Sequence, residues 1–239
     1  MLAIVRLVIL VVLIILVSLG GLVMCAFLAP IPKRARDRVY YLGRAFAYAS
    51  RLFGFTVTSV VHPKANDVEQ AVYVANHQNN YDLFTVAHVV PRNVVTVGKS
   101  TLKWIPFFGT LYWASGNFLI KRHDRNKAIA RITDIVLKMR QTGLSIWMFP
   151  EGTRSRGRGW LPFKRGAFHA AIQAGVPIIP VVCSDTHGQV KLNRWHNGGV
   201  TVKVLEPIST KGLTDHDVAE LTARCEALMH QAKEESRSR

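Results

Sequence analysis

The stretch Val72–Asp82, VYVANHQNNYD, holds residues whose types and spacing could do chemistry. An apolar run, Ala71–Ala75, leads into several amides, one histidine (His77) and one carboxylate (Asp82), and a mostly apolar segment follows as far as Pro91. This order predicts a buried strand, a functional turn and the start of a helix. A carboxylate that holds one imidazole nitrogen leaves the other nitrogen available as a general base.

The spacing of His77 and Asp82 limits how they can meet. Residues five apart on a regular helix point about 140° away from each other, so contact requires a turn between them. Asn79 or Asn80 can cap the following helix, which places Asp82 in its first turn. An isolated H-x4-D pattern also occurs by chance, and taken alone it is better explained as a buried loop with a helix cap.

A second polar segment, Phe149–Arg158, FPEGTRSRGR, follows another apolar run. Arg154 stands near Gly152, where the backbone can approach an anion closely. The planar fork of arginine suits a phosphate monoester better than the ammonium of lysine does. A solvated basic loop is the alternative interpretation. Lys99, which follows the apolar run Val94–Val97, is a weaker candidate for an anion contact and could equally be a surface lysine.

Two further blocks complete an ordered set, Gly116–Arg122 (GNFLIKR) and Val176–Val181 (VPIIPV). With these blocks the sequence resembles the glycerolipid acyltransferase family over nearly its whole length. The resemblance implies that His77 is the general base and that Asp82 orients it. It assigns substrate binding to Arg122, Glu151, Gly152, Thr153 and Arg154, with Glu151 organising its loop. Lys121 stands where family members usually carry an acidic residue, so ion pairing around Arg122 differs here.

The same resemblance implies the reaction and its partners. The donor is an acyl thioester of acyl carrier protein or coenzyme A, the acceptor is the sn-2 hydroxyl of lysophosphatidic acid, and the product is phosphatidic acid. Glycerol 3-phosphate or another lysophospholipid is an alternative acceptor. A catalytically silent, membrane-anchored protein that binds anionic lipid or nucleic acid is the alternative from a different class.

The residues also indicate which mechanism to expect. The chain contains no G-x-S-x-G, so no nucleophile elbow is present. Direct attack by an acceptor hydroxyl that His77 deprotonates is therefore the economical route. No Cys/His cluster has metal-binding spacing, and no glycine-rich nucleotide loop follows a predicted strand. We therefore expect no metal and no bound cofactor.

The chain is strongly basic, with 31 Lys and Arg against 15 Asp and Glu and a net charge of +16. This excess favours anionic partners: nucleic acid, acidic lipid headgroups, or a phosphorylated substrate. The basic residues are spread over many segments and no nucleic-acid-binding motif is present, so we expect no nucleic-acid partner. The three cysteines stand at unrelated spacings in apolar surroundings, which predicts free buried thiols and a reducing, cytoplasmic compartment.

Residues 1–53 are predicted to form a membrane anchor. Leu7–Leu28 carries no charge and, as a helix, its 22 residues reach roughly 33 Å, enough to cross a bilayer. A cleaved signal peptide fits poorly because the run is long and lacks a small-x-small site. The basic segment Pro30–Arg38 favours the cytoplasmic face of the inner membrane. Val39–Phe53 is predicted as an amphipathic helix, interfacial or in the core. The resemblance favours a hairpin entering one leaflet; hydropathy is equally consistent with a single span.

Residues 54–239 alternate strand-like and helix-like runs, which predicts one α/β domain with a mixed sheet flanked by helices. Segment Lys103–Leu111, KWIPFFGTL, fits neither the helical nor the strand periodicity. Such an apolar segment is most simply interpreted as part of the core, and the resemblance places it beside the acyl channel. The expected strands are Phe55–Val61, Ala71–Ala75, Val94–Val97, Ser145–Phe149, Ile178–Val182 and Val200–Leu205. The expected helices are Tyr81–Val90, Lys127–Gln141, Gly166–Ala174 and Asp215–Ser236.

Overall fold

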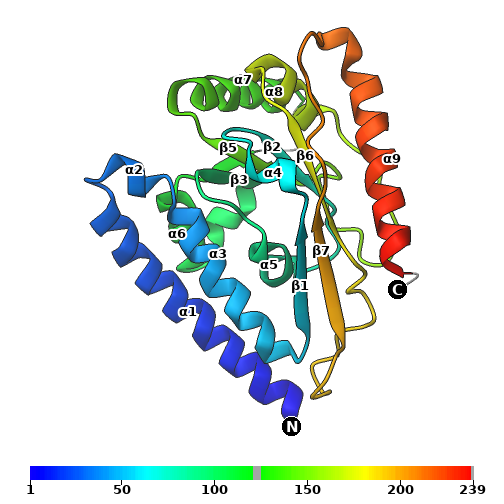
Figure 1. The fold of residues 1–239 in the computed structure, drawn as a ribbon. Helices are drawn as coiled ribbons and strands as arrows, with labels where there is room; N and C mark the ends of the chain where they lie inside the picture. The colour runs from blue at the N-terminus through cyan, green and yellow to red at the C-terminus, as the bar shows by residue number, and fades with distance from the viewer. Residues whose placement is uncertain (121–124, 238–239) are drawn as a thin grey trace.

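The computed structural model describes residues 1–120 and 125–237, and it is built around a seven-stranded sheet in the order β1-β7-β6-β2-β5-β3-β4 (Figure 1). Strand β7 runs antiparallel to β6 and pairs in parallel with β1, while all other neighbours are parallel. The predicted mixed sheet is therefore confirmed. The strands are β1 (Thr56–Val61), β2 (Val72–Ala75), β3 (Val94–Lys99), β4 (Phe118–Ile120), β5 (Ser145–Met148), β6 (Ile178–Cys183) and β7 (Gly199–Val204).

The central strands read as continuous apolar runs because both faces of the sheet are covered. Every residue of β2 and β6 is buried, as expected for parallel strands between two helical layers. The edge strand β1 is largely exposed and carries threonines and a serine. Burial of both faces explains why β2 and β6, at the centre of the sheet, carry no charged residue.

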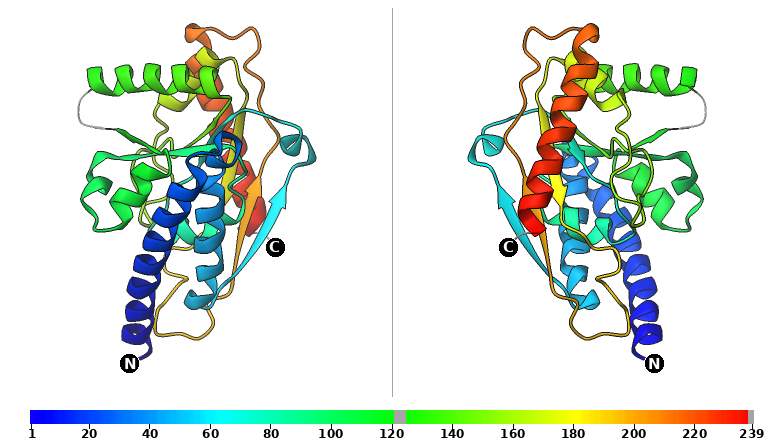
Figure 2. Two further views of the ribbon diagram at one scale, coloured as in Figure 1. Left: turned by 90° about the vertical axis from the view of Figure 1, so that its left-hand side faces the viewer. Right: turned by 90° about the vertical axis from the view of Figure 1, so that its right-hand side faces the viewer.

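Helices cover both faces of the sheet (Figures 1 and 2). On one side α3 (Arg38–Ala49) and α5 (Asp82–Thr85) lie against the sheet, and α1 (Leu2–Leu28) packs outside them on α3 and α6 (Phe108–Ala114). On the other side lie α7 (Arg125–Thr142), α8 (Gly166–Ala174) and α9 (Val218–Arg237). The short helices are α2 (Pro32–Ala35), α4 (Pro63–Asn66), η1 (Ser50–Phe53), η2 (Val86–His88), η3 (Ser100–Trp104) and η4 (Asp215–Asp217).

Helix α1 is, among the described residues, the one helix long and apolar enough to cross a membrane. It begins at Leu2 rather than at Leu7, and its mean hydropathy reaches 3.2. One stripe of the helix is buried: a Cβ added at Gly21 would lie 2.7 Å from a methyl carbon of Leu42 and 2.8 Å from one of Leu111. Glycine at this position therefore lets α1 pack closely on α3 and α6.

The amino-terminal turns of α1 also contact the domain, at the other end of the helix from Gly21. Arg6 donates hydrogen bonds to the carbonyl oxygens of Leu192, Arg194 and Trp195, and its guanidinium lies 5.5 Å from the Trp195 ring centroid. The helix thus lies along the domain at both of its ends (Figure 2). Its outward face remains covered with exposed Leu, Val and Ile side chains.

Two sequence expectations about the segment after β2 are wrong. The predicted helix Tyr81–Val90 is a single α-turn, α5, followed by the 3₁₀ turn η2. Arg44 of α3 takes the carbonyl oxygens of Ala87 and His88 as hydrogen-bond acceptors, so those groups need no helical partner. Neither asparagine caps α5, because Asn79 Oδ1 accepts instead from Tyr81 N at 2.8 Å, within the turn.

The other differences concern short elements. Strand β4 was not expected, because three residues at a sheet edge give no readable alternation. Segment Lys103–Leu111 contributes the end of η3 and the start of α6. The remaining strands and helices agree with prediction to within a few residues, including the end of α8 at Gly175, which adopts φ +72° as a glycine cap can.

Candidate active site

The sheet topology gathers the predicted site residues at one edge. Strands β6, β2, β5, β3 and β4 all point the same way, so their carboxyl ends meet there. His77 follows β2, Arg154 follows β5, and Lys99 ends β3. In open α/β sheets, ligands bind outside the carboxyl ends of the strands. Strand β4 reaches the same edge, but Arg122, which follows it, lies outside the described residues.

His77 and Asp82 are in direct contact. The distance from His77 Nδ1 to Asp82 Oδ2 is 2.6 Å, and the His77 side chain is 14% exposed. Nε2 of the same ring has no hydrogen-bond partner among the described residues. The segment between the two residues is therefore a turn that brings them into contact, as their spacing requires. The ring is held at Nδ1 and available at Nε2.

The chain wraps around the Asp82 carboxylate. Oδ2 accepts hydrogen bonds from the backbone N–H groups of Gln78 (2.7 Å) and Asn79 (3.1 Å) as well as from His77. The residue is 2% exposed. Burial penalises an isolated carboxylate, and several donors on one oxygen offset that cost. The orientation of the Asp82 side chain is therefore fixed by its own turn.

The segment after β5 is bonded to the His77 loop along its backbone. Ser155 N donates to His77 O at 2.8 Å, and Arg156 N donates to Gln78 O at 2.9 Å. The Phe149 ring stacks on the His77 imidazole with centroids 4.0 Å apart and planes at 18°. The two polar segments thus form one unit. Phe149 was not singled out from the sequence, although its place at the start of FPEGTR was a usable signal.

Two amides fasten the His77 loop to the end of β6. Asn76 Nδ2 donates to Cys183 O (3.0 Å), and Asn76 Oδ1 accepts from Cys183 N (2.7 Å). Gln78 Nε2 donates to the carbonyl oxygens of Cys183 and Ser184, and its Oε1 accepts from Thr186 N at 3.0 Å. Both side chains are buried. The sequence showed a cluster of amides but not their partners, which lie more than a hundred residues away.

Arg154 is partly buried in the loop after β5, and no ion pair joins it to a carboxylate of the described chain. Its Nε is buried without a hydrogen-bond partner among the described residues. Gly152 has φ +70°, and a Cβ placed there would lie 3.0 Å from the end of the Lys164 side chain, which crosses over it. Thr153 is exposed between these residues. The loop therefore presents an arginine and a lysine with little local neutralisation.

Glu151 points toward the histidine loop. Its Oε1 accepts from His77 N at 2.7 Å, and the residue is 4% exposed. Burial raises the pKa of Glu151 to about 7, against the opposing effects of the His77 and Leu161 backbone N–H groups and of Lys233. Lys99, by contrast, is exposed at the end of β3.

The Glu151 carboxyl predicts a pH-dependent stability. The pKa of Glu151 is about 7 in the folded state and 4.5 in the unfolded state, so the folded protein binds this proton more tightly. The free energy of unfolding is therefore unaffected below pH 4.5 and falls between pH 4.5 and 7, by at most about 3 kcal/mol. Glu151→Gln should remove this loss, so the melting temperature of the purified variant should exceed that of the wild type increasingly from pH 5 to pH 7. Glu69→Gln, at an exposed site, should follow the wild type; a constant difference at every pH for Glu151→Gln contradicts the assignment.

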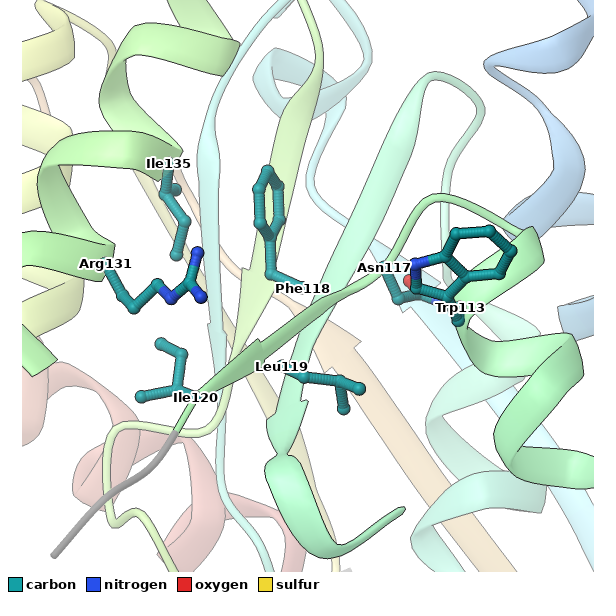
Figure 3. A pocket seen from close by; sticks show the side chains of 7 residues that line it. All are labelled: Trp113, Asn117, Phe118, Leu119, Ile120, Arg131 and Ile135. Carbon is teal, nitrogen blue, oxygen red and sulfur yellow. The ribbon is translucent and has the colours of Figure 1, made fainter. Parts of the chain in front are cut away.

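A surface cavity of about 210 Å³ lies at the β4 edge of the sheet. Arg131 and Ile135 of α7 face Phe118 and Ile120 of β4 across it (Figure 3). None of its lining residues is one of the predicted site residues. Among the residues the structure describes, no group of three His, Cys, Asp or Glu side chains could hold a metal ion. All three cysteines are free and buried, as predicted.

Comparison with known proteins agrees with this geometry. The acyltransferase family model matches residues 58–184, which include both polar segments. The 1-acyl-sn-glycerol-3-phosphate acyltransferase of Escherichia coli is 49% identical over 231 residues, 97% of this chain and 93% of its own. The enzyme of that name from Haemophilus influenzae is 49% identical over 81% of this chain and 80% of its own.

A solved structure shows the same fold. The crystal structure of the 1-acyl-sn-glycerophosphate acyltransferase PlsC from Thermotoga maritima aligns with a TM-score of 0.77 and 26% identity, over 100% of this chain and 95% of that one. The similarity therefore includes the N-terminal helices as well as the sheet. With the matched family model and relatives near 50% identity over most of its length, the chain belongs to the glycerolipid acyltransferase family.

Proposed function

We propose that this protein transfers a fatty acyl group from an acyl thioester to the sn-2 hydroxyl of 1-acyl-glycerol 3-phosphate, lysophosphatidic acid, and so forms phosphatidic acid. The observation that carries the proposal is the His77–Asp82 pair, 2.6 Å apart with Nε2 available, joined by backbone hydrogen bonds to the loop of Arg154. The names of the relatives near 50% identity support the same reaction.

In this mechanism His77 Nε2 takes the proton of the acceptor hydroxyl as its oxygen attacks the thioester carbonyl. The Asp82 carboxylate holds Nδ1–H and stabilises the imidazolium that forms. The tetrahedral intermediate collapses with cleavage of the carbon–sulfur bond, and the imidazolium returns its proton to the leaving thiolate. The products are the new ester and a free thiol. No covalent acyl-enzyme is needed.

Arg154 is proposed to hold the acceptor phosphate, with the Thr153 hydroxyl and the tight turn at Gly152 beside it. Its guanidinium lacks an ion pair within the described chain, which leaves it available for a phosphate. Arg122 and Lys99 are proposed as further contacts. The donor is proposed to be an acyl thioester of acyl carrier protein or coenzyme A, both strongly anionic and suited to a chain of net charge +16. No metal or cofactor takes part in this proposal.

The assignment is tested with the purified full-length protein, radiolabelled acyl-CoA and a panel of acceptors. We expect labelled phosphatidic acid from lysophosphatidic acid, and much slower product formation from glycerol 3-phosphate or a lysophospholipid with a substituted phosphate. Faster transfer to another acceptor overturns the acceptor assignment. Absence of transfer from acyl-CoA and from acyl-ACP alike, in protein that binds anionic vesicles, favours a silent lipid-binding protein.

Residues 1–53 are proposed to anchor the catalytic domain, 54–239, to the inner membrane. In the segment from the end of η3 through α6, Trp104, Ile105, Phe107 and Trp113 are all exposed although large and apolar. Because α6 packs on α1 and η3 packs on α6, we propose that this segment adds exposed apolar side chains to the membrane-facing surface of the helix. Contact of α1 with the domain at both ends favours a helix that lies in one leaflet with the domain against it.

We further propose that the catalytic domain faces the cytoplasm, and a single engineered thiol tests this. The native cysteines are buried, so they should react poorly with a membrane-impermeant maleimide. Lys211→Cys, at an exposed site in the domain, should be labelled in inverted membrane vesicles and protected in intact spheroplasts. The unsubstituted protein is the matched control. Labelling of Lys211→Cys in intact spheroplasts contradicts the orientation.

A further inference from the structure

Helix α9 carries a buried lysine near its end. Lys233 is 6% exposed; its Nζ lies 2.7 Å from Asp185 Oδ1 and 5.1 Å from the ring centroid of Trp160. Lysine is almost never buried this far unless it is paired. The helix has an apolar stripe with which to dock, so attachment alone does not require a buried charge. That stripe is Val218, Leu221, Cys225, Met229 and Ala232.

We call Lys233, Asp185 and Trp160 the C-terminal clamp. Asp185 and Trp160, the two residues that Lys233 contacts, belong to the two loops that meet at His77. Asp185 stands between Ser184 and Thr186 in the loop after β6, where a backbone carbonyl and a backbone N–H hold the Gln78 side chain. Asn79 Nδ2 also donates to Thr186 Oγ1 at 2.7 Å, so two side chains of the His77 loop are hydrogen-bonded to this loop.

The second partner, Trp160, follows the FPEGTRSRGR segment. The next residue is Leu161, whose backbone N–H acts on the Glu151 carboxyl. Glu151 in turn accepts from His77 N, and Gln78 N donates to Asp82. The clamp is therefore linked to both sides of His77. Trp160 is next to Leu161, which acts on Glu151, and Asp185 lies between the two residues that bond Gln78. The His230 ring, one turn earlier on α9, stacks on Trp160 at 4.3 Å and fixes the indole from the same helix.

We propose that Lys233 is a positioning residue for the acyl transfer. Its ammonium contacts Asp185 in the loop after β6 and Trp160 in the loop after β5, and so fixes the position of one loop relative to the other. Because both loops bond the His77 segment, the position of His77 Nε2 depends on this contact. The inference rests on the proposed function, because it is the turnover of that reaction that positioning would affect. Lys233 also lowers the pKa of Glu151, as a cation close to the second loop should.

The chain offers a matched control in Lys203 of β7. Its Nζ donates to Ala232 O at 3.2 Å and lies 3.8 Å from Glu235 Oε2, so it too joins α9 to the sheet. It is also largely buried, at 19% exposure of the side chain. Lys203 and Lys233 therefore share the task of docking the helix. Of these two lysines, Lys233 alone contacts the loops around His77 within the part of the chain that the structure describes.

The test measures kcat and KM for lysophosphatidic acid in the full-length enzyme. Displacements near 1 Å can cost orders of magnitude in rate, so we expect Lys233→Met to lower kcat by about tenfold or more with KM within about twofold. Asp185→Asn should lower kcat comparably, and the double variant should be little worse than either, because both remove one interaction. Lys233→Arg should recover part of kcat. Lys203→Met should lower the melting temperature but leave kcat within about twofold.

A second measurement does not depend on turnover. Hydrogen–deuterium exchange of a peptide covering residues 76–82 should speed up in Lys233→Met and stay at the wild-type rate in Lys203→Met. If the two variants behave alike in both kcat and exchange, the lysine only docks the helix and the inference is wrong. If the wild type transfers no acyl group, the proposed function fails, and the exchange comparison still decides whether Lys233 orders the loop. Should Lys233→Met not fold, Asp185→Asn and Lys233→Arg provide the same comparison.

Discussion

We expect His77→Ala to abolish acyl transfer while the protein still folds and binds membranes. The imidazole is the one titratable group placed at the carboxyl edge with one nitrogen held by a buried carboxylate and the other without a partner in the described chain. A positioned general base contributes roughly 10²–10⁴-fold, and the variant loses that contribution entirely. Steady-state kinetics with lysophosphatidic acid and acyl-CoA measure the loss, which should appear in kcat.

The controls for this prediction use the geometry around the ring. His196→Ala, at an exposed histidine, should keep wild-type turnover. Asp82→Asn should be impaired about 10²-fold or more, because an amide oxygen can accept from His77 and from the backbone but cannot stabilise imidazolium as a carboxylate does. A His77→Ala enzyme that keeps more than a few per cent of wild-type kcat would rule out the general-base mechanism.

The reactive pair could be predicted from sequence because its interaction is local. His77 and Asp82 are five residues apart, and the amide-rich segment between them signalled the turn that lets them touch. The central strands were predictable for a similar reason, since apolar runs such as Ile178–Val182 are long enough to identify a strand buried on both faces. In both cases the information lies within a few neighbouring residues.

The supports of the pair were not predictable, because their partners are distant in sequence. Gln78 reaches Ser184 and Thr186, and Lys233 reaches Asp185. Nothing in the pattern around Gln78 distinguishes an amide that bonds a strand end from one that faces water. A lysine at position 233, within a charged stretch near the end of the chain, looks like a solvated residue until the loops are placed beside it.

The incorrect prediction of a helix after β2 also arises from partners that are distant in the sequence. Tyr81–Val90 is apolar enough for a helix, but Arg44 donates hydrogen bonds to the carbonyl oxygens of Ala87 and His88, which stand 43 and 44 residues after it. The half-buried His88 is also within hydrogen-bond distance of Ser50 Oγ and the Ala47 carbonyl oxygen through its Nε2. Tertiary hydrogen bonds thus satisfy carbonyl groups at the end of this segment, where a helix would leave them without partners, and they accompany two short turns in place of one helix. Local propensity is a weak prior where such partners exist.

We expect Arg154→Ala to lower kcat/KM for lysophosphatidic acid by about one to two orders of magnitude, since a hydrogen bond to a charged group contributes roughly 1.5–3 kcal/mol. Arg154 lies partly buried, with Nε unpartnered and no ion pair in the described chain, so a substrate phosphate would be its main partner. Arg154→Lys should recover little, because an ammonium cannot make the bidentate contact. The measurement is the acceptor dependence of the initial rate.

The matched control is Arg156→Ala, two residues away in the same loop. The Arg156 side chain is exposed, and its backbone bond to Gln78 O is kept in the variant. Both changes remove one charge from a net +16, so both should bind anionic vesicles almost as the wild type does. Only Arg154→Ala should raise the KM for lysophosphatidic acid. If instead the two variants lose vesicle binding and turnover in parallel, with KM unmoved, the loop contacts membranes rather than the acceptor phosphate. His77 would then need a different acceptor site, and Lys99, Arg122 and Lys164 would be the next cations to substitute.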